Sequence, residues 1–415
     1  MSEQGVMRHG VWAPVPPRVR LLILTTIMNS LAFGYFLIYV TAYLPEIGFQ
    51  ASVVGTIFAI EGTALVLAGI PLAMLSDRIG RKPFLVLGSL GFTPTILVFG
   101  LTRDVNTLYA AAALGGVCEA AFLASWNALI ADLTDLSNRD AAFSLSFIVG
   151  TATFSGGSAL PLAFGPIEAA TGLSSLVVHS QTFIVLGAAS LSAPVALWVL
   201  LRNYHGKPPQ KKTEGGGLGE LRPALEFSVF NSIIGLGAGL IIPLMGTWLL
   251  LKFAVPDSYS GPFLAVSGLT IAFAAIASPR LSKKVGLFPA IVTTTGSSTV
   301  FMLSLAFVPS VFAAGGLYLI RAALMNMSSP LMDSFLMGIT PQNRRGLAST
   351  INAVVWRVPN SVSTIFGGYI LTYSAFNVPS LGVSHLDLPW VLATALYVLG
   401  ISLLYVNFRN VKPSL

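Results

Sequence analysis

The sequence predicts an all-α membrane protein with twelve transmembrane helices arranged as two related sets of six. Three observations predict this class: an apolar composition, twelve long apolar runs, and a charged connector that recurs in weaker form in the second half. Hydrophobic residues make up 54% of the 415 residues and charged residues only 9%, with a mean hydropathy of +0.79. Because a soluble globular domain carries about 25% charged residues, this chain cannot cover itself with a water-facing surface.

Each apolar run is long enough for one membrane crossing, because a helix needs about 20 mostly apolar residues to cross about 30 Å of hydrocarbon. The runs are too long and too continuously apolar for the tilted strands of a closed barrel, the other architecture that spans a membrane. In chain order, the predicted spans are 21–44, 51–75, 83–101, 107–131, 141–164, 180–201, 224–250, 259–280, 287–308, 311–338, 347–373 and 388–408.

The distribution of Lys and Arg sets the expected orientation, because cytoplasmic loops carry an excess of these residues. Of the 23 Lys and Arg, only Arg103 and Lys252 fall on the loops of one side, and Arg321 and Arg357 fall inside spans. All the others lie on the opposite side. We therefore expect a multi-pass protein of the plasma membrane with both termini in the cytoplasm. The formal charge of +7 follows from this asymmetry, so no nucleic-acid partner is predicted.

The charged connector is the main sign of an internal duplication. It reads LSDRIGRKP at 75–83, after the second span, and LSKKVGLFP at 281–289, after the eighth. Two further short motifs recur in the same order, and the offset between their two copies is nearly the same as for the connector. They are MNSL at 28–31 with FNSI at 230–233, and SNRDA at 137–141 with QNRRG at 342–346. Three such matches indicate two homologous halves.

The stretch between the sixth and seventh spans separates these halves. It runs from Arg202 to Arg222, contains runs of Lys, Pro and Gly, and is typical of a flexible linker. We therefore expect an N-terminal six-helix bundle at 1–201, a cytoplasmic linker at 202–222 and a C-terminal six-helix bundle at 223–415.

The connector resembles the signature of the major facilitator superfamily, which reads roughly G-x-L-a-D-R-x-G-R-K between the second and third spans. The matching residues of this chain are Asp77, Arg78, Gly80, Arg81 and Lys82. The first glycine of the signature is replaced by Ala73. The resemblance extends over the chain through its six-plus-six plan. It implies two six-helix bundles around a central cavity that opens to each side in turn. Spans 1, 4, 7 and 10 would line that cavity, and spans 2, 5, 8 and 11 would form the seam between the halves.

The signatures of individual subfamilies are mostly missing. The sugar-porter word P-E-S-P-R after span six is replaced by Arg202–Gly206, and the peptide-transporter word E-x-x-E-R-F is absent from span one. The antiporter word of span five, G-x-x-x-G-P-x-x-G-G, is met only by Gly150 and the pair Gly156–Gly157. The resemblance therefore leaves the substrate open and favours antiport only slightly.

Four ionisable residues lie deep in predicted spans, namely Glu61, Glu119, Arg321 and Arg357. A charged side chain at such depth costs on the order of 2.5–3.5 kcal/mol on insertion scales. Such residues either form structural ion pairs that fix helix contacts or line a transport pathway. The resemblance places Glu61 and Arg357 on the two helices that face each other across the seam, so we expect these two to interact. Pro359 offers helix eleven a place to bend.

The resemblance also places Glu119 on span four and Arg321 on span ten, both facing the cavity, where we expect them to lie opposite each other. Polar side chains at helical spacing from these two, and asparagines from spans one and seven, complete the predicted lining. The candidate cavity residues are Asn29, Glu119, Trp126, Asn127, Asn231, Arg321, Ser328 and Ser329. For Trp126 the alternative is lipid or interface packing, and for the asparagines and serines it is interhelical hydrogen bonding.

Proton coupling is assigned first to Glu119 and then to Glu61. A buried carboxyl beside an arginine is balanced between desolvation and attraction, so it can exchange a proton as its access to water changes. Asp333 is expected to act as a gate or anchor near the end of span ten. The gating set consists of Asp77, Arg78, Gly80, Arg81, Lys82, Arg357 and Asp333. Asp132, near a span end, is expected to be solvated.

Other chemistry is not indicated. The four histidines are placed in loops or tails as solvated side chains, and none has metal-ligand spacing. The single cysteine, Cys118, excludes an intrachain disulfide and a cysteine metal cluster. No phosphate-binding loop or nucleophile motif is present, so we expect neither an enzyme nor a cofactor.

The favoured function is therefore a secondary active transporter of a small organic solute, coupled to protons or another ion, with efflux slightly favoured. The mostly apolar cavity helices suit an amphipathic or aromatic solute. Proton-coupled uptake by symport, and a membrane sensor or scaffold that does not transport, stay open as alternatives. The expected partners are the small-molecule substrate, the coupling ion and the lipid bilayer, and the expected state is a monomer.

The topology yields a first testable prediction. Cysteines introduced at Asn106 and Pro379, on the side with few Lys and Arg, should react with an impermeant thiol reagent added outside the cell. Cysteines at Gly215 and Ser414 should not react until the membrane is permeabilised. Labelling of the Gly215 variant in intact cells would overturn the assigned orientation.

Overall fold

The computed structural model describes residues 15–135, 138–204 and 221–411. Among them, regular structure is helical apart from one antiparallel bridge between Val378 and Val383. The α-helices of the first half are α1 (Pro17–Leu24), α2 (Ile27–Ile38), α3 (Leu44–Glu46), α4 (Ala51–Ile79), α5 (Arg81–Leu101), α6 (Val105–Asp132), α7 (Arg139–Ser158), α8 (Phe164–Thr171), α9 (Ser175–Ser190) and α10 (Ser192–Leu200). Those of the second half are α11 (Arg222–Gly239), α12 (Met245–Phe253), α13 (Asp257–Val285), α14 (Leu287–Ala306), α15 (Val311–Gly338), α16 (Arg345–Thr372) and α17 (Leu388–Phe408).

Short tighter or wider turns join several of these helices. A π-helical turn, η1 (Tyr39–Tyr43), lies between α2 and α3. The 3-10 turns are η2 (Leu160–Ala163), η4 (Ile242–Leu244), η5 (Gln342–Arg344), η6 (Ser374–Phe376) and η7 (Pro379–Leu381).

The helices account for all twelve predicted spans. Within the described residues, ten helical segments are long and apolar enough to cross a membrane. Four of these segments join shorter helices: Pro17–Glu46, Ala141–Thr171, Ser175–Leu200 and Arg222–Phe253. Helices α13 and α16, 29 and 28 residues long, occupy the eighth and eleventh predicted spans. The predicted fold class is thus confirmed.

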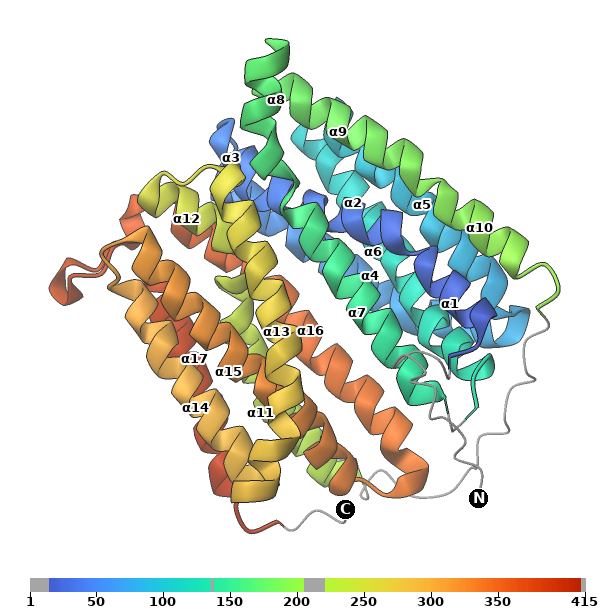
Figure 1. The fold of residues 1–415 in the computed structure, drawn as a ribbon. Coiled ribbons are helices and arrows are strands. Elements are labelled where there is room, and N and C mark those ends of the chain that lie inside the picture. The colour runs from blue at the N-terminus through green and yellow to red at the C-terminus, as the bar shows by residue number, and fades with distance from the viewer. Residues whose placement is uncertain (1–14, 136–137, 205–220, 412–415) are drawn as a thin grey trace, which may run out of the picture.

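The helices form two bundles, α1–α10 and α11–α17, which lie side by side (Figure 1). Within the first bundle, α4 packs on α6, α5 on α6 and α2 on α7; within the second, α11 packs on α16 and α14 on α15. Between the bundles, α4 packs along α16 and α7 along α13. The α4–α16 contact is the seam of spans two and eleven that the resemblance implied. The predicted linker falls mostly in 205–220, outside the described residues.

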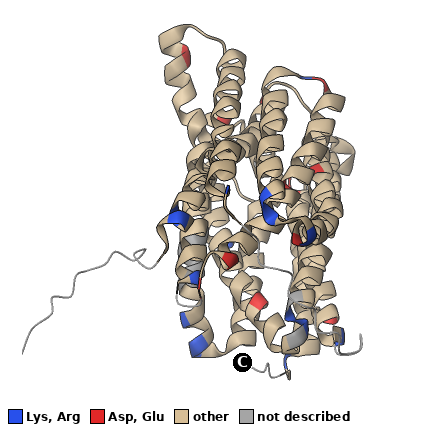
Figure 2. Cartoon of the chain, turned by 90° about the vertical axis from the view of Figure 1, so that its right-hand side faces the viewer, with Lys and Arg blue, Asp and Glu red and all other residues tan. Residues whose placement is uncertain are grey.

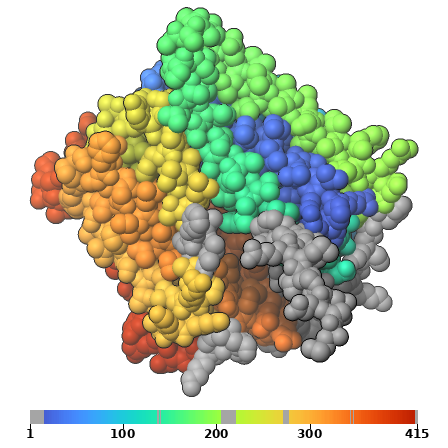
Figure 3. All heavy atoms as spheres, in the orientation of Figure 1, coloured from blue at the N-terminus to red at the C-terminus, as the bar shows by residue number. Residues whose placement is uncertain are grey.

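The two bundles are joined at one end of the molecule and separate toward the other. Thr247 Oγ1 donates to the carbonyl oxygen of Thr41 at 2.6 Å, and the Ser52 amide donates to Thr372 Oγ1 at 2.9 Å. These bonds join η1 to α12 and the start of α4 to the end of α16. In Figure 1, α3 and α12 lie at the end opposite the one that carries the C-terminus. Figure 3 shows the hollow between the bundles, with α16 at its floor. The protein is therefore open on the side that we predict to be cytoplasmic.

The basic residues lie mainly toward this open end. Figure 2 shows Lys and Arg mostly over the lower half of the molecule, where the C-terminal end lies, while the top carries mainly Asp and Glu. This pattern matches the asymmetry read from the sequence. The orientation in the membrane itself stays a prediction.

The charged connector contains a turn that only glycine adopts readily. Gly80 separates α4 from α5 with φ +106°, and Gly286 separates α13 from α14 with φ +93°. A residue with a Cβ is strained at such angles. The two halves therefore repeat the same backbone turn, although the charged residues around it have diverged.

The connector is fastened to the end of α6. Arg81 forms an ion pair with Asp132 and also donates to the carbonyl oxygen of Ala128. The Tyr204 hydroxyl donates to the same Asp132 carboxylate at 2.6 Å. Burial and the neighbouring carboxylate raise the pKa of Tyr204 to about 12, so this hydroxyl keeps its proton at neutral pH. The prediction that Asp132 is solvated was wrong, because it is held by two partners.

The remaining connector residues make weaker contacts. Lys82 Nζ lies 5.6 Å from the ring centroid of Trp198 on α10, a cation–π distance. Asp77 and Arg78 are exposed on the last turn of α4. Their role in gating stays a prediction.

Candidate functional site

A cavity of about 200 Å³ lies inside the N-terminal bundle, between α2, α4, α5 and α6. Its wall is partly polar and partly aromatic. The polar lining is Thr26, Asn29, Ser30, Glu61, Ser89 and Glu119. The rest of the wall includes Phe33, Phe92, Phe122, Leu123 and Cys118. Such a wall suits a ligand that is largely apolar but carries a charged or polar group.

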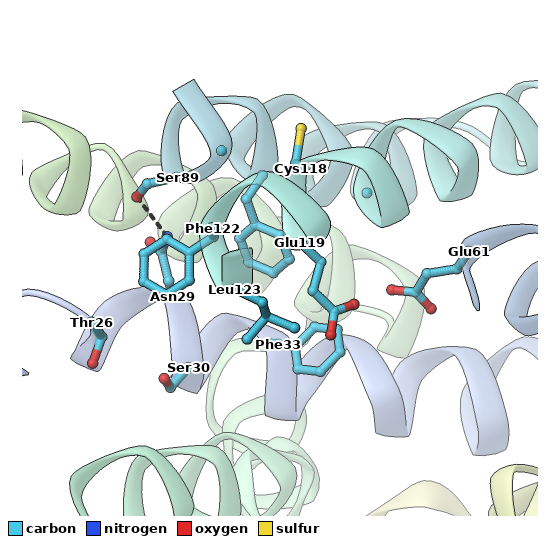
Figure 4. A pocket seen from close by; sticks show the side chains of 13 residues that line it. Thr26, Asn29, Ser30, Phe33, Glu61, Ser89, Cys118, Glu119, Phe122 and Leu123 are labelled. Atoms are coloured by element: carbon cyan, nitrogen blue, oxygen red, sulfur yellow. Dashed lines mark hydrogen bonds between the residues drawn. The ribbon is translucent and has the colours of Figure 1, made fainter. Parts of the chain in front are cut away.

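Two carboxyl groups share this cavity. Glu61 projects from α4 and is only 8% exposed, and Glu119 projects from α6. Figure 4 shows their carboxyl groups pointing toward each other, with the ring of Phe33 beside Glu119. Glu119 Oε2 is buried and makes no hydrogen bond within the described residues. An acceptor of this kind is open to a proton or to a cationic ligand.

Arg357 on α16 is the charged group that the C-terminal half brings toward this pair. It interacts electrostatically with both Glu61 and Glu119. No ion pair within 4.0 Å joins it to either carboxylate in the part of the chain that the structure describes. The expected coupling of Glu61 and Arg357 across the seam therefore takes the form of attraction at longer range.

A glycine on α6 sets the spacing of the two carboxyl groups. A Cβ on Gly116 would lie 2.1 Å from the carbonyl oxygen of Glu61, so the backbones of α6 and α4 touch at this point. Glu119 follows three residues later, on the same face of α6. The close approach is thus what brings its carboxyl group into the same cavity as that of Glu61.

Asn29 adds an amide to the cavity wall. Its Nδ2 donates to Ser89 Oγ at 2.9 Å, which fixes the orientation of the side chain (Figure 4). Its Oδ1 is buried and accepts no hydrogen bond from the described residues. Asn29 thus makes the interhelical hydrogen bond that was its alternative role, and its Oδ1 can still accept a hydrogen bond from a ligand.

Arg321 lies elsewhere. It is 4% exposed and donates from Nη2 to the Tyr397 hydroxyl at 2.7 Å, inside the C-terminal bundle between α15 and α17. It is absent from the cavity lining, and the positive charge near Glu119 is that of Arg357. The structure thus does not bring Glu119 and Arg321 together.

Asn231 and Ser328 make the interhelical hydrogen bonds that were their alternative role, and Trp126 packs inside the N-terminal bundle. Trp126 Nε1 donates to Ser146 Oγ at 3.1 Å, and its ring stacks on Phe122 with centroids 5.2 Å apart. Asn231 Nδ2 donates to Asn352 Oδ1 at 3.3 Å, and Ser328 accepts from Thr295 Oγ1 at 2.8 Å. Asn127, Ser329 and Asp333 are exposed. None of these six lines the cavity.

Sequence reasoning missed a buried histidine. His179 was predicted to be a solvated loop residue, and this was wrong: it lies on α9, 1% exposed, in contact with Tyr35 and Asp257. The aromatic cavity residues were also missed, because phenylalanines are spread throughout the apolar spans and nothing singles these out.

Comparison with known families gives a match over most of the chain. The family model of the Major Facilitator Superfamily matches residues 22–364. The chain is 22% identical over 412 residues to the class H tetracycline resistance protein of Pasteurella multocida, covering 95% of this chain and 97% of that protein.

Two similar proteins of Bacillus subtilis (strain 168) match over shorter stretches. The uncharacterized MFS-type transporter YqjV is 26% identical over 190 residues, 44% of this chain and 46% of that one. Multidrug resistance protein 2 is 32% identical over 125 residues, 28% and 30% of the two chains. The matched stretches thus span less than half of both relatives.

Solved structures share the fold at low identity. A bacterial homologue of the human lysosomal transporter Spinster, inward-facing and unoccupied, superposes with a TM-score of 0.75 at 18% identity, covering 95% of this chain and 97% of that one. The nucleoside transporter NupG superposes with a TM-score of 0.74 at 13% identity, covering 94% and 99%. These likenesses support the fold and not the substrate.

The contact at Gly116 gives a prediction. Gly116→Ala should push α6 away from α4, since its methyl group would meet the Glu61 carbonyl, and overpacking of this kind costs about 1–3 kcal/mol. The melting temperature of the purified protein in detergent, followed by intrinsic fluorescence, should fall. Gly150→Ala is the matched control, because a Cβ there meets nothing within 4 Å. Equal melting temperatures for the two variants would contradict the close packing of α4 and α6.

Proposed function

The chain belongs to the major facilitator superfamily, and from this premise we propose that it exports an amphipathic organic cation in exchange for protons. The observation that carries the proposal is the pair of carboxyl groups, Glu61 and Glu119, in one small aromatic cavity. Among the described residues that line this cavity, none is Lys, Arg or His.

Burial of two carboxylates so close together sets what can occupy the cavity. Their combined negative charge is costly in an apolar bundle unless it is neutralised. Each carboxylate can be neutralised by a proton or can pair with an organic cation, but the same carboxylate cannot do both at once. Competition for the same two groups is the physical basis of exchange, because loading one species displaces the other.

The aromatic residues favour a particular kind of cation. Phe33, Phe92 and Phe122 offer ring faces, and a cation within about 6 Å of such a face is attracted to it. The hydroxyls of Ser30 and Thr26 and the Asn29 amide offer a few polar contacts. A solute with a protonated amine and an aromatic or apolar body fits this wall better than a sugar does.

The similar proteins are compatible with this proposal. One relative that aligns over nearly the whole chain is named as a tetracycline resistance protein, and another as a multidrug resistance protein. Export of amphipathic organic compounds is therefore the direction that we favour for this chain, from the cytoplasm across the plasma membrane.

We propose that the charge of Arg357 stabilises the two carboxylates when the cavity holds neither protons nor a cation. It stands on α16, across the seam from α4, where its charge reaches both carboxylates. Pro359, two residues later within α16, removes a backbone donor and lets the helix bend. Movement of α16 along α4 would change the distance between Arg357 and the carboxylates, and with it the tendency of the pair to take up protons.

Replacement of Glu119 tests the proposal. Glu119→Gln keeps size and polarity but removes the titratable group, so it should abolish accumulation driven by a proton gradient and leave exchange across the membrane. The measurement is uptake of radiolabelled tetraphenylphosphonium, an aromatic cation, into everted vesicles that are acid inside, as a function of pH. Accumulation by Glu119→Gln should fall to the level of vesicles treated with a protonophore.

The matched control is Glu226→Gln, the same substitution at a half-exposed position of α11, where the carboxylate pairs with Arg222 at 2.8 Å. It should transport as the wild type does. A Glu119→Gln protein that still concentrates the cation with unchanged pH dependence would remove Glu119 from proton coupling.

A further inference from the structure

His179 is buried where the two bundles meet, at the end of the molecule that is closed. It lies on α9, in the N-terminal bundle, and its ring nitrogens face two different partners. Nδ1 is 2.7 Å from the Tyr35 hydroxyl on α2, and Nε2 is 3.3 Å from Asp257 Oδ2 on α13. The histidine is 1% exposed and Asp257 is 6% exposed. This contact therefore joins the two bundles through a pair of titratable groups.

Aromatic rings enclose the imidazole on its remaining sides. The ring of Tyr43 stacks on it with centroids 3.5 Å apart, and Phe164 meets it edge-on at 4.7 Å. Tyr39, which with Tyr43 belongs to the π-helical turn η1, lies at 5.8 Å. The imidazole is thus shielded from water while the bundles are in contact.

The charged groups around the pair are mostly acidic. Glu46 on α3 accepts a hydrogen bond from the Asp257 amide at 3.3 Å, and Glu168 on α8 also acts electrostatically on Asp257. The one cation that faces the pair among the described residues is Arg103, whose guanidinium lies 5.7 Å from the Tyr39 ring centroid. With neutral imidazole and an ionised Asp257, three carboxylates therefore face a single guanidinium.

The hydrogen bonds of the site can accommodate one additional proton. The Tyr35 hydroxyl is within reach of His179 Nδ1 at 2.7 Å and of the His179 carbonyl oxygen at 3.3 Å. When Nδ1 carries no proton, the hydroxyl donates to it. When Nδ1 is protonated, the N–H donates to the Tyr35 oxygen, whose own hydrogen turns to the carbonyl. Nδ1 of His179 and the Tyr35 hydroxyl therefore keep a partner in both states.

We propose that His179, Tyr35 and Asp257 form a proton-binding site between the bundles, separate from the cavity of Glu61 and Glu119, which holds the closed end together when it is protonated. With one proton shared between His179 and Asp257, these two buried groups carry no net charge, which burial favours. Without it, an unneutralised carboxylate remains beside Glu46 and Glu168. When this end opens, α13 leaves α9, both groups enter water, and the proton is released on that side.

The direction of the pH effect follows from linkage. The closed arrangement holds a proton that the open one releases, so a fall in pH stabilises the closed end and a rise in pH favours opening. On the predicted orientation this end faces outside. The site would then let external acidity shift the protein toward the conformation that is open to the cytoplasm.

The test is a distance measurement that involves no transported solute. Spin labels on cysteines at Asn106 and Ser380, exposed positions of the two bundles at the closed end, report the separation by pulsed electron paramagnetic resonance in nanodiscs. The protein carries Cys118→Ala, and also Glu61→Gln and Glu119→Gln so that titration of the cavity does not contribute. The longer distances should gain population as the pH rises from about 6 to about 9.

Variants of the pair decide the outcome. In Asp257→Asn the distance distribution should no longer change with pH, because the carboxylate that needs the shared proton is gone. In His179→Gln the pH response should be smaller than in the parent protein, because Asp257 has lost its partner. Asp387→Asn is the matched control. The Asp387 carboxylate pairs with Lys252 at 2.5 Å, at the same end of the molecule but within one bundle. The pH response of the Asp387→Asn protein should therefore persist. A pH response in His179→Gln or Asp257→Asn equal to that of the parent protein would overturn the proposal. Because the cavity carboxylates are absent here, either result leaves the role of Glu119 to be judged separately.

Discussion

Glu61 and Glu119 share a small cavity inside an apolar bundle. Two carboxylates in such a place must be neutralised by protons, by a cationic ligand or by a nearby positive charge. Gly116 makes the arrangement possible, because its missing Cβ lets α6 touch the backbone of α4 at Glu61. The seam between α4 and α16 then brings Arg357 within electrostatic reach of both groups. Packing, charge and the movement proposed at the seam therefore act on the same two side chains.

The two halves share a backbone plan but contribute differently to these sites. Glycines with positive φ repeat the connector turn at positions 80 and 286. The cavity lies wholly in the N-terminal bundle. The C-terminal bundle supplies single charged residues that reach across the interface, Arg357 toward the cavity and Asp257 toward His179. Separation of the bundles at either end would change the surroundings of one of these pairs, which is how a rigid-body movement can alter the affinity for protons.

The fold could be predicted from the sequence because the length of each apolar run and the placement of Lys and Arg are direct consequences of the bilayer. The acidic cavity residues could be named because charge at mid-membrane depth is costly and therefore stands out. Their neighbours could not be named, because a span that is apolar on all sides gives no sign of which face meets which helix. Arg321 thus faces Tyr397 instead of Glu119, and Trp126 packs on Phe122. Boundaries mattered as well: α9 begins at Ser175, five residues before the predicted span, so His179 is inside the helix.

We propose that protons and an organic cation compete for Glu61 and Glu119. The most direct measurement is proton release when tetraphenylphosphonium binds to the purified protein in weakly buffered detergent solution, followed with a pH indicator. If they compete, the wild-type protein should release protons in proportion to the cation bound, and the Glu61→Gln/Glu119→Gln protein should release none. Binding of the cation to the wild type without proton release, or unchanged release by the double variant, would contradict it.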